Sequence, residues 1–316
     1  MDKCNICNNK ISLFSKKNFI DKSKKYNWEN DSTVELAGLE STNASLGYCK
    51  KCLHTSIFPR FDTDRLYNGN AGFEARKKAF EYHNPDSEYG SNRNLTSSKK
   101  NAKRIEREFI RISNITNKIV KISNDFDKSN KKSISILDYG GGDGYLVKII
   151  KEILESKTNF NFDFKVETSL YDPAYENNIS NVKPDIIIIS HVLEHIHDLE
   201  KFFKKLSKIT DDDTQFIIEV PDERLKILKN IIFQSKVYFN FHVNIFTVRS
   251  LAVLFDSNGF NSDFSYTNVF YRGVRTNVIN GIAGKKIRNS TSFNMYEIFS
   301  FFNLIVSKIK IKLLNF

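Results

Sequence analysis

Apolar residues follow two alternating patterns between about residues 131 and 280. Short runs rich in isoleucine and valine, such as "SISILDY" (133–139) and "PDIIIIS" (184–190), are typical of strands buried on both faces. The segments between such runs, such as "GYLVKIIKEILES" (144–156), repeat their apolar residues at helical spacing. Runs at 164–173 and 214–222 also fit strands, those at 198–209 and 247–260 fit helices, and 260–279 fits a closing strand pair. This alternation predicts an α/β fold in which helices cover both faces of a parallel sheet.

Apolar segments also flank this region. Residues 99–122 repeat isoleucine and phenylalanine at helical spacing, which predicts an amphipathic helix packed on the main domain. The stretch 295–316 is apolar and then basic, and we expect a helix that packs on the domain, with contact to a membrane surface as the alternative. The expected units are a cysteine-containing module (1–58), a linker or lid with the amphipathic helix (59–130), the main domain (131–280) and a C-terminal amphipathic helix (281–316).

All four cysteines lie in the first unit, as two pairs of the form Cys-x-x-Cys. Each pair, Cys4 with Cys7 and Cys49 with Cys52, brings two thiolates close enough to bind one tetrahedral ion, so the four predict a Cys4 zinc site. Because such a site has no open coordination position, we expect the zinc to be structural. Cysteines paired in this way suit a reducing compartment, and "MDKCNICNNK" lacks the apolar core of a secretory signal, so a cytoplasmic location is expected.

The chain is basic, with a formal net charge of +11 from 48 basic and 37 acidic residues. Such a surplus steers a protein toward phosphate, nucleic acid or an anionic membrane surface. The lysines are scattered, however, and no basic stripe is interleaved with aromatic residues. A solvated surface is therefore the favoured interpretation, and no nucleic-acid partner is expected.

A glycine-rich turn follows the first strand of the main domain. Asp138 closes the strand, and glycines at 140, 141, 142 and 144 lead directly into a helix. Such a turn lets the backbone approach a ligand closely, and the helix start offers unpaired N–H groups. A phosphate-binding P-loop would continue with Gly-Lys-Ser/Thr, but Tyr145 and Leu146 stand there. Gly140, Gly142 and Gly144 fall at every second position, which departs from the G-x-G-x-x-G spacing of the dinucleotide fingerprint. S-adenosylmethionine is the third candidate ligand.

"LDYGGGDGYL" resembles the first motif of class I S-adenosylmethionine-dependent methyltransferases, and later segments match in the same order. "LYDP" places Asp172 where that family binds the ribose hydroxyls, although a turn former before Pro173 is the simpler alternative. "DIIIISHVLEHIHDLEKFF" resembles the fourth strand and the motif after it. The resemblance implies a Rossmann-like sheet of seven strands in 131–280, with a small N-terminal zinc-binding domain. The cofactor-binding residues that it implies are Asp138, Gly140, Gly141, Gly142, Gly144, Asp172, Pro173, His191 and Val192.

The segment "HVLEH" (191–195) has a second interpretation, because its spacing also fits an inverted zinc protease motif. That class carries the motif on a helix, whereas here it directly follows an apolar strand. The methyltransferase resemblance places His191 and Val192 at the cofactor pocket. Glu194 and His195 are expected to brace the pocket or face the substrate.

The combination of a Cys4 module with this domain resembles deoxysugar C-methyltransferases that act on nucleotide-linked sugars. Those enzymes carry a Glu-His pair near the acceptor; here His242 stands at the histidine position and Phe241 at the glutamate position. We therefore expect a sugar or nucleotide-sugar acceptor for a surface glycan, with O-methylation favoured over C-methylation. His242 is the candidate base for the hydroxyl proton, with a structural histidine as the alternative. Tyrosines at 67, 82 and 89 are candidates for a lid.

Two other classes of function compete with this interpretation. Zinc knuckles and basic helices also occur in nucleic-acid-binding proteins, and an RNA methyltransferase would share the cofactor motifs. Amino-methylating DNA enzymes carry Asn/Asp-Pro-Pro-aromatic after the fourth strand, where this chain has "HVLEH". A protein that binds the cofactor without catalysis is the third alternative.

Overall fold

The structure is a computed structural model of the 316-residue chain. The residues that it describes are 3–15, 45–58, 99–126, 131–142, 144–156, 164–172, 183–223, 242–271 and 274–287. The expected lid tyrosines, Pro173, Phe241 and the segment 288–316 lie outside these ranges.

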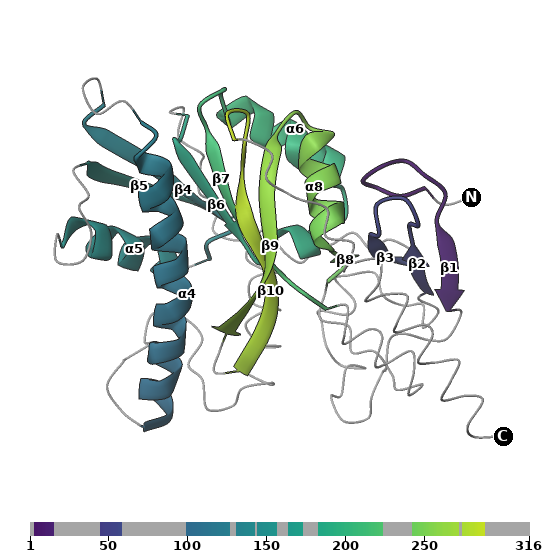
Figure 1. Cartoon of the computed structure of the whole chain (residues 1–316), viewed down its shortest axis with the longest axis horizontal. Coiled ribbons are helices and arrows are strands. Elements are labelled where there is room, and N and C mark those ends of the chain that lie inside the picture. The colour runs from purple at the N-terminus through teal and green to yellow at the C-terminus, as the bar shows by residue number, and fades with distance from the viewer. Residues whose placement is uncertain are drawn as a thin grey trace.

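The centre of the molecule is a mixed sheet with the strand order β5-β4-β6-β7-β10-β9 (Figure 1). Its strands are β4 (Ser133–Tyr139), β5 (Lys165–Tyr171), β6 (Ile186–Ser190), β7 (Gln215–Pro221), β9 (Asn261–Tyr271) and β10 (Val274–Gly284). The first four strands in this order run parallel, and β10 and β9 close the sheet as an antiparallel pair. The predicted α/β alternation and the closing strand pair are confirmed. The described residues supply six strands of this sheet, so the predicted seventh strand stays a prediction.

Helices cover both faces of this sheet because its buried strands are apolar on both sides. Along β6, Ile186 and Ile188 pack with α4 (Lys99–Ser123) and α5 (Tyr145–Glu155) on one face. Ile187 and Ile189 pack with α6 (Leu199–Ile209) and α8 (Val248–Asp256) on the other. Isoleucines 112, 115, 119 and 122 of α4 are buried, which confirms the amphipathic helix and its packing on the domain. No helix among the described residues combines the length and the apolar character needed to cross a membrane.

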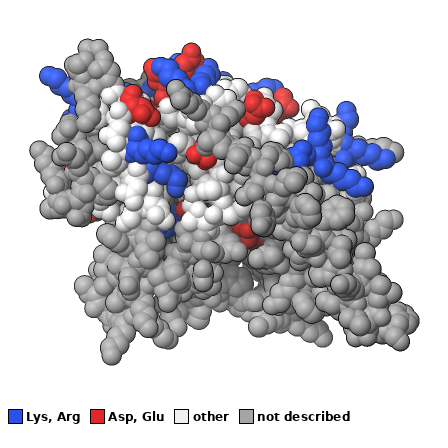
Figure 2. All heavy atoms as spheres, viewed as in Figure 1, with Lys and Arg blue, Asp and Glu red and all other residues white. Residues whose placement is uncertain are grey.

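A second, four-stranded antiparallel sheet has the order β1-β2-β3-β8. Three strands come from the N-terminal module, namely β1 (Ser12–Ser15), β2 (Ser45–Tyr48) and β3 (Thr55–Phe58). The fourth, β8 (Asn244–Ile245), immediately precedes α8, so the main domain completes the sheet of the module. Figure 2 shows basic side chains gathered at this end of the molecule, whereas acidic and basic side chains are interspersed along the upper edge of the view.

Candidate functional site

The glycine turn lies at the carboxyl end of β4, and three of its glycines have positive φ angles. The φ angles of Gly140, Gly142 and Gly144 are +80°, +60° and +74°, in the region that strains L-residues. A Cβ atom at Gly140 would also lie 2.5 Å from Cγ2 of Val192, so this turn and the segment after β6 are in close contact. A Cβ atom at Gly142 would meet nothing within 4 Å, so the turn has open space there for a ligand.

Two buried carboxylates flank the turn. Asp138 is 1% exposed and Asp172, at the end of β5, is 4% exposed. Asp172 Oδ2 accepts a hydrogen bond of 2.9 Å from the Gly142 N–H, and the Gly140 N–H donates to the Tyr171 carbonyl at 2.6 Å. Asp172 therefore orders the turn, and a carboxylate at this position is of the type that accepts hydroxyl groups of a ligand. The helix α5 begins at Tyr145, so its first N–H groups and the positive end of its dipole lie next to the same turn.

His191 directly follows β6 and bridges two buried acids. Its φ angle is +56°, and its N–H donates to the Glu219 carbonyl at 2.8 Å. Nδ1 lies 3.2 Å from Glu194 Oε1, and Nε2 lies 3.2 Å from Glu219 Oε1. Burial opposes ionisation of Glu194, yet the histidines around it, with His191 the first, lower its pKa. The ring of His191 is thus held by two carboxylates, while the neighbouring Val192 is the residue in contact with the glycine turn.

Arg111 and Glu219 form a buried ion pair next to His191. This pair was not predicted from the sequence. Arg111 Nε, from α4, donates to Glu219 Oε1 at 2.5 Å, and Nη2 donates to Ser190 Oγ. Burial by itself would raise the pKa of Glu219, but the Arg111 guanidinium and His191 hold it well below its usual range. One signal for this pair was present in the sequence, because Glu219 interrupts the apolar run "FIIEVP" of a buried strand. Its partner, 108 positions earlier, carried no such signal.

His242 lies at the same edge of the sheet. Its Nδ1 donates to Glu223 Oε2 at 2.8 Å, and its ring packs edge-on against His195 with 4.7 Å between centroids. Glu223 follows β7, so a carboxylate from another segment contacts the histidine whose neighbour in sequence is Phe241. Sequence reasoning missed Glu223 because it stands 19 positions before its partner. We refer below to Arg111, Glu219, His191, Glu194, His195, His242 and Glu223 together as the histidine–acid network.

Asn244 joins the histidine–acid network to the N-terminal module. This residue is 2% exposed and lies in β8. Its Oδ1 accepts from Asn5 Nδ2 at 2.9 Å and lies 3.3 Å from His54 Nε2. Its Nδ2 donates to the carbonyls of Leu193, at 3.0 Å, and Ile196, at 2.5 Å. These carbonyls bracket the 3-10 helix η3 (Leu193–His195), so one amide group connects the two parts of the molecule.

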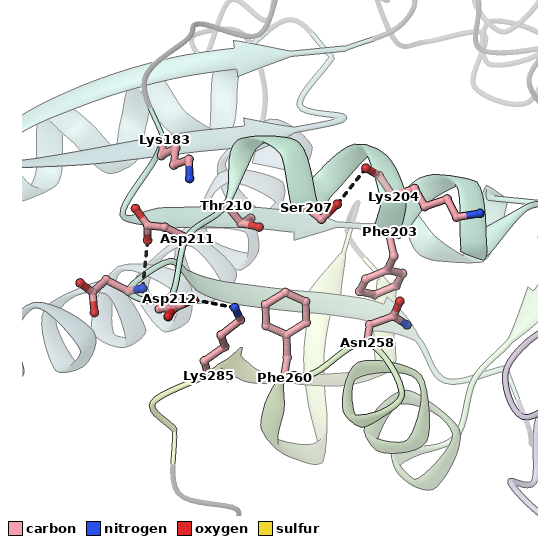
Figure 3. A pocket seen from close by; sticks show the side chains of 11 residues that line it. Lys183, Phe203, Lys204, Ser207, Thr210, Asp211, Asp212, Asn258, Phe260 and Lys285 are labelled. Carbon is pink, nitrogen blue, oxygen red and sulfur yellow. Dashed lines mark hydrogen bonds and ion pairs between the residues drawn. The ribbon is translucent and has the colours of Figure 1, made fainter.

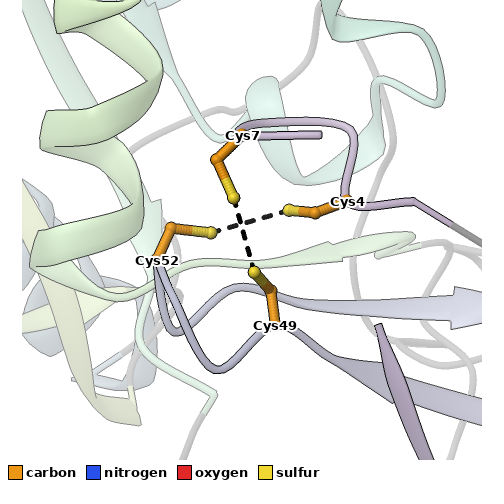
Figure 4. Close-up of side chains that lie close together, drawn as sticks. All are labelled: Cys4, Cys7, Cys49 and Cys52. Carbon is orange, nitrogen blue, oxygen red and sulfur yellow. Dashed lines mark hydrogen bonds between the residues drawn. The ribbon is translucent and has the colours of Figure 1, made fainter. Parts of the chain in front are cut away.

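The four cysteines converge from two loops and point toward a common centre (Figure 4). The sulfurs of Cys4 and Cys52 lie 3.6 Å apart and those of Cys7 and Cys49 3.4 Å apart, too far for disulfides. Zn–S bonds of about 2.3 Å in a tetrahedron place sulfurs about 3.8 Å apart, close to these values. A hydrogen bond from the Cys52 thiol lowers the pKa of Cys4 to about 5, which favours a thiolate. Donor type, number and spacing therefore fit zinc.

A separate groove of about 590 Å³ lies at the opposite edge of the sheet (Figure 3). Lys183 and Asp211–Asp213 line it just before β6 and β7, and Lys285 lines it after β10. Its charges pair with one another, as in the 2.6 Å contact between Lys285 Nζ and Asp212 Oδ1. Ligands of parallel sheets bind beyond the carboxyl ends of the strands, so the glycine turn and not this groove is the candidate site.

Comparisons with known proteins identify a methyltransferase domain in the chain. Residues 108–263 match the sequence profile of a family described as "Methyltransferase domain", and no curated protein sequence matches the chain. Solved structures that resemble the chain include a SAM-dependent methyltransferase from Methanosarcina mazei. It shares 15% identity, the match covers 53% of this chain and 97% of that chain, and the TM-score is 0.36.

A second such structure is the magnesium protoporphyrin IX methyltransferase of Synechocystis PCC 6803 with bound SAH. It shares 12% identity, with 67% of this chain and 95% of that chain covered and a TM-score of 0.39. These structural similarities are too low to bear on the acceptor. The profile match includes the glycine turn, the segment after β6 and the end of β7. Residues 108–263 therefore form a methyltransferase domain, and the chain is an S-adenosylmethionine-dependent methyltransferase.

Proposed function

We propose that this methyltransferase transfers a methyl group to a hydroxyl of a sugar or nucleotide-linked sugar in surface glycan synthesis. The observation that carries the proposal is the pair of His242 and Glu223, which lies next to His195 at the edge that also bears the glycine turn. A histidine whose Nδ1–H is held by a carboxylate presents Nε2 as a proton acceptor. The resemblance of the Cys4 module together with this domain to nucleotide-sugar methyltransferases, read from the sequence, supports the class of acceptor.

Bound S-adenosylmethionine would supply a methyl group on a sulfonium, a good leaving group. The glycine turn would receive the cofactor, with Asp172 accepting from its ribose hydroxyls and Asp138, His191 and Val192 bordering it. His242 would take the acceptor proton at Nε2, while Glu223 stabilises the imidazolium that forms. Alignment of the acceptor with the methyl group provides most of the acceleration in such a transfer.

We also propose that the four cysteines bind a structural zinc ion. Their geometry matches a closed tetrahedral site, and three of the four are fully buried. Because Asn5 lies between Cys4 and Cys7 and contacts Asn244, the ion would hold the module that supports η3. Its role would be to position the histidine–acid network without contacting the substrate.

The acceptor can be tested by incubating nucleotide-sugars with enzyme and cofactor and measuring the intact mass of the products. A mass gain of one methylene group on a nucleotide-sugar is the expected result. The absence of any gain across purine- and pyrimidine-linked hexoses and deoxyhexoses, with cofactor binding intact, would refute the sugar acceptor. Methylation of RNA under the same conditions would favour the nucleic-acid alternative.

The role of His242 can be tested on the methylated acceptor. His242→Ala should lower kcat by at least about 100-fold, the usual contribution of a general base, and leave the Kd for S-adenosylmethionine unchanged. His197→Ala, two positions beyond His195, is the matched control and should stay near wild type. A His242→Ala enzyme with near-wild-type kcat would make this histidine structural.

A further inference from the structure

A second group of metal-ligand side chains exists besides the cysteines. Glu194 and His195 come from η3, and His242 comes from the segment before β8. One ligand atom from each residue lies within 4.8 Å of the others. His195 Nε2 is 3.9 Å from Glu194 Oε1. Ligand atoms bonded at about 2.1 Å to one ion lie at most about 4 Å apart, so side-chain shifts below about 1 Å would close the site.

The buried carboxylate of Glu194 is the strongest argument for a metal ion at this group of side chains. Its side chain is 1% exposed, and among the described residues neither oxygen accepts a well-aligned hydrogen bond. The nearest ring nitrogens are His191 Nδ1 at 3.2 Å and His195 Nε2 at 3.9 Å, and each carries a charge only when its imidazole is protonated. A buried carboxylate whose nearest polar neighbours are imidazole nitrogens at 3.2 and 3.9 Å is costly unless a cation compensates its charge. An ion between Glu194 and the two histidines would provide that compensation.

The surroundings also resemble the outer shell of a metal site. Metal-binding histidines usually donate their second ring N–H to a carboxylate, which fixes the tautomer. Glu223 accepts from His242 Nδ1 at 2.8 Å in this way and leaves Nε2 for an ion. Asn244 donates to the carbonyls of Leu193, the first residue of η3, and Ile196, the residue after it, so the backbone that carries Glu194 and His195 is fixed.

We propose that Glu194, His195 and His242 bind a divalent transition-metal ion next to the acceptor position. Two imidazoles with one carboxylate suit Zn²⁺, Co²⁺ or Fe²⁺, whereas Mg²⁺ and Ca²⁺ prefer all-oxygen sites. Three protein ligands leave at least one coordination position for water or substrate, in contrast to the closed cysteine site.

The role of the ion in methyl transfer rests on the proposed function. An acceptor hydroxyl bound at the open position would lose its proton to water more easily. Its oxygen would then form the bond to the methyl carbon while the carbon–sulfur bond breaks, giving a methyl ether and neutral S-adenosylhomocysteine. With the ion bound, His242 is a ligand and not the base, so the metal content of the enzyme decides between the two roles.

The experiment counts metal in the full-length protein without acceptor. After incubation with Zn²⁺ and gel filtration, elemental analysis should give two zinc ions per chain in the wild type. His195→Ala, His242→Ala and Glu194→Gln should each give one, and the control His197→Ala should give two. In the Co²⁺-loaded protein, the thiolate charge-transfer bands of the cysteine site should persist in all variants. The weaker visible bands of the second site should disappear from the three ligand variants.

One metal ion per wild-type chain would overturn the proposal, as would a second ion that survives all three ligand substitutions. Binding of S-adenosylmethionine, followed by calorimetry, verifies that each variant is folded. The metal proposal and the glycan proposal are tested separately. A wild-type protein that binds two ions but has no activity on nucleotide-sugars would refute only the proposed acceptor. One ion together with an inactive His242→Ala enzyme would leave His242 as the base.

Discussion

The glycine turn and the histidine–acid network share one edge of the sheet but are built in different ways. The turn consists of residues 138–144, and its contacts with Tyr171 and Asp172 come from the adjacent strand. The network draws on α4, the residue after β6, η3, β7 with the residues after it, and the segment before β8, over positions 111 to 242. The turn is therefore built from one strand-turn-helix unit and one neighbouring strand, whereas the network exists only when several elements distant in sequence pack together. A substitution that loosens the packing between elements should therefore disturb the histidine–acid network before it disturbs the glycine turn.

The largest effect is expected from breaking the buried pair of the network. Arg111→Met leaves Glu219 buried without its main cationic partner, and loss of one partner of a buried ion pair costs about 3–5 kcal/mol. The free energy of unfolding by urea should fall by this amount. The double variant Arg111→Met/Glu219→Gln should recover much of the loss, because no uncompensated charge remains. If the free energy of unfolding of Arg111→Met lay within about 1 kcal/mol of the wild-type value, the ion pair would not be important for stability.

The same pair predicts a dependence of stability on pH. The folded pKa of Glu219 lies below its unfolded value, so its contribution is complete above the unfolded pKa of about 4.3. The contribution is lost as the pH falls through the folded value. Between about pH 5 and pH 3, wild type should lose more stability than the double variant, measured by urea unfolding at each pH. Parallel losses in the two proteins would argue against a depressed pKa.

A smaller effect is expected where the network joins the N-terminal module. Asn244→Ala removes the contacts to Asn5, His54, Leu193 and Ile196, and unsatisfied buried partners cost about 1–3 kcal/mol. The variant should show lower thermal stability and a lower kcat, with an unchanged Kd for S-adenosylmethionine. Asn5→Ala, which removes a single contact, is the matched control. Equal losses in the two variants would show that the contacts to η3 contribute little.

The smallest effect on stability is expected in the glycine turn. Gly142 and Gly259 both have positive φ angles, and a Cβ atom at either would meet nothing within 4 Å. Alanine at each position should therefore cost a similar amount, about 1–2 kcal/mol, through backbone strain alone. Only Gly142→Ala should weaken S-adenosylmethionine binding, by about tenfold or more in calorimetry, because only Gly142 belongs to the turn that we propose receives the cofactor. Equal affinities in the two variants would place the cofactor elsewhere.

The strands and helices of the main domain were predictable because periodicity is a property of single elements. The isoleucines of β6 and of α4 show their buried faces in the sequence itself. The acidic partner of His242 was not predictable in this way. Its expected place in sequence is occupied by Phe241, and Glu223 contacts the histidine only because β7 ends beside the segment before β8.

From the sequence alone, residue spacing determined the glycine turn, the pairing of the cysteines and the α/β alternation, because each depends on neighbours within a few positions. The tertiary structure decided which side chains meet across elements. Arg111 with Glu219, His242 with Glu223 and Asn244 with η3 are contacts that strand order and helix packing create. The physical reason is that burial and pairing of charges depend on distances in space, which separation along the chain does not fix.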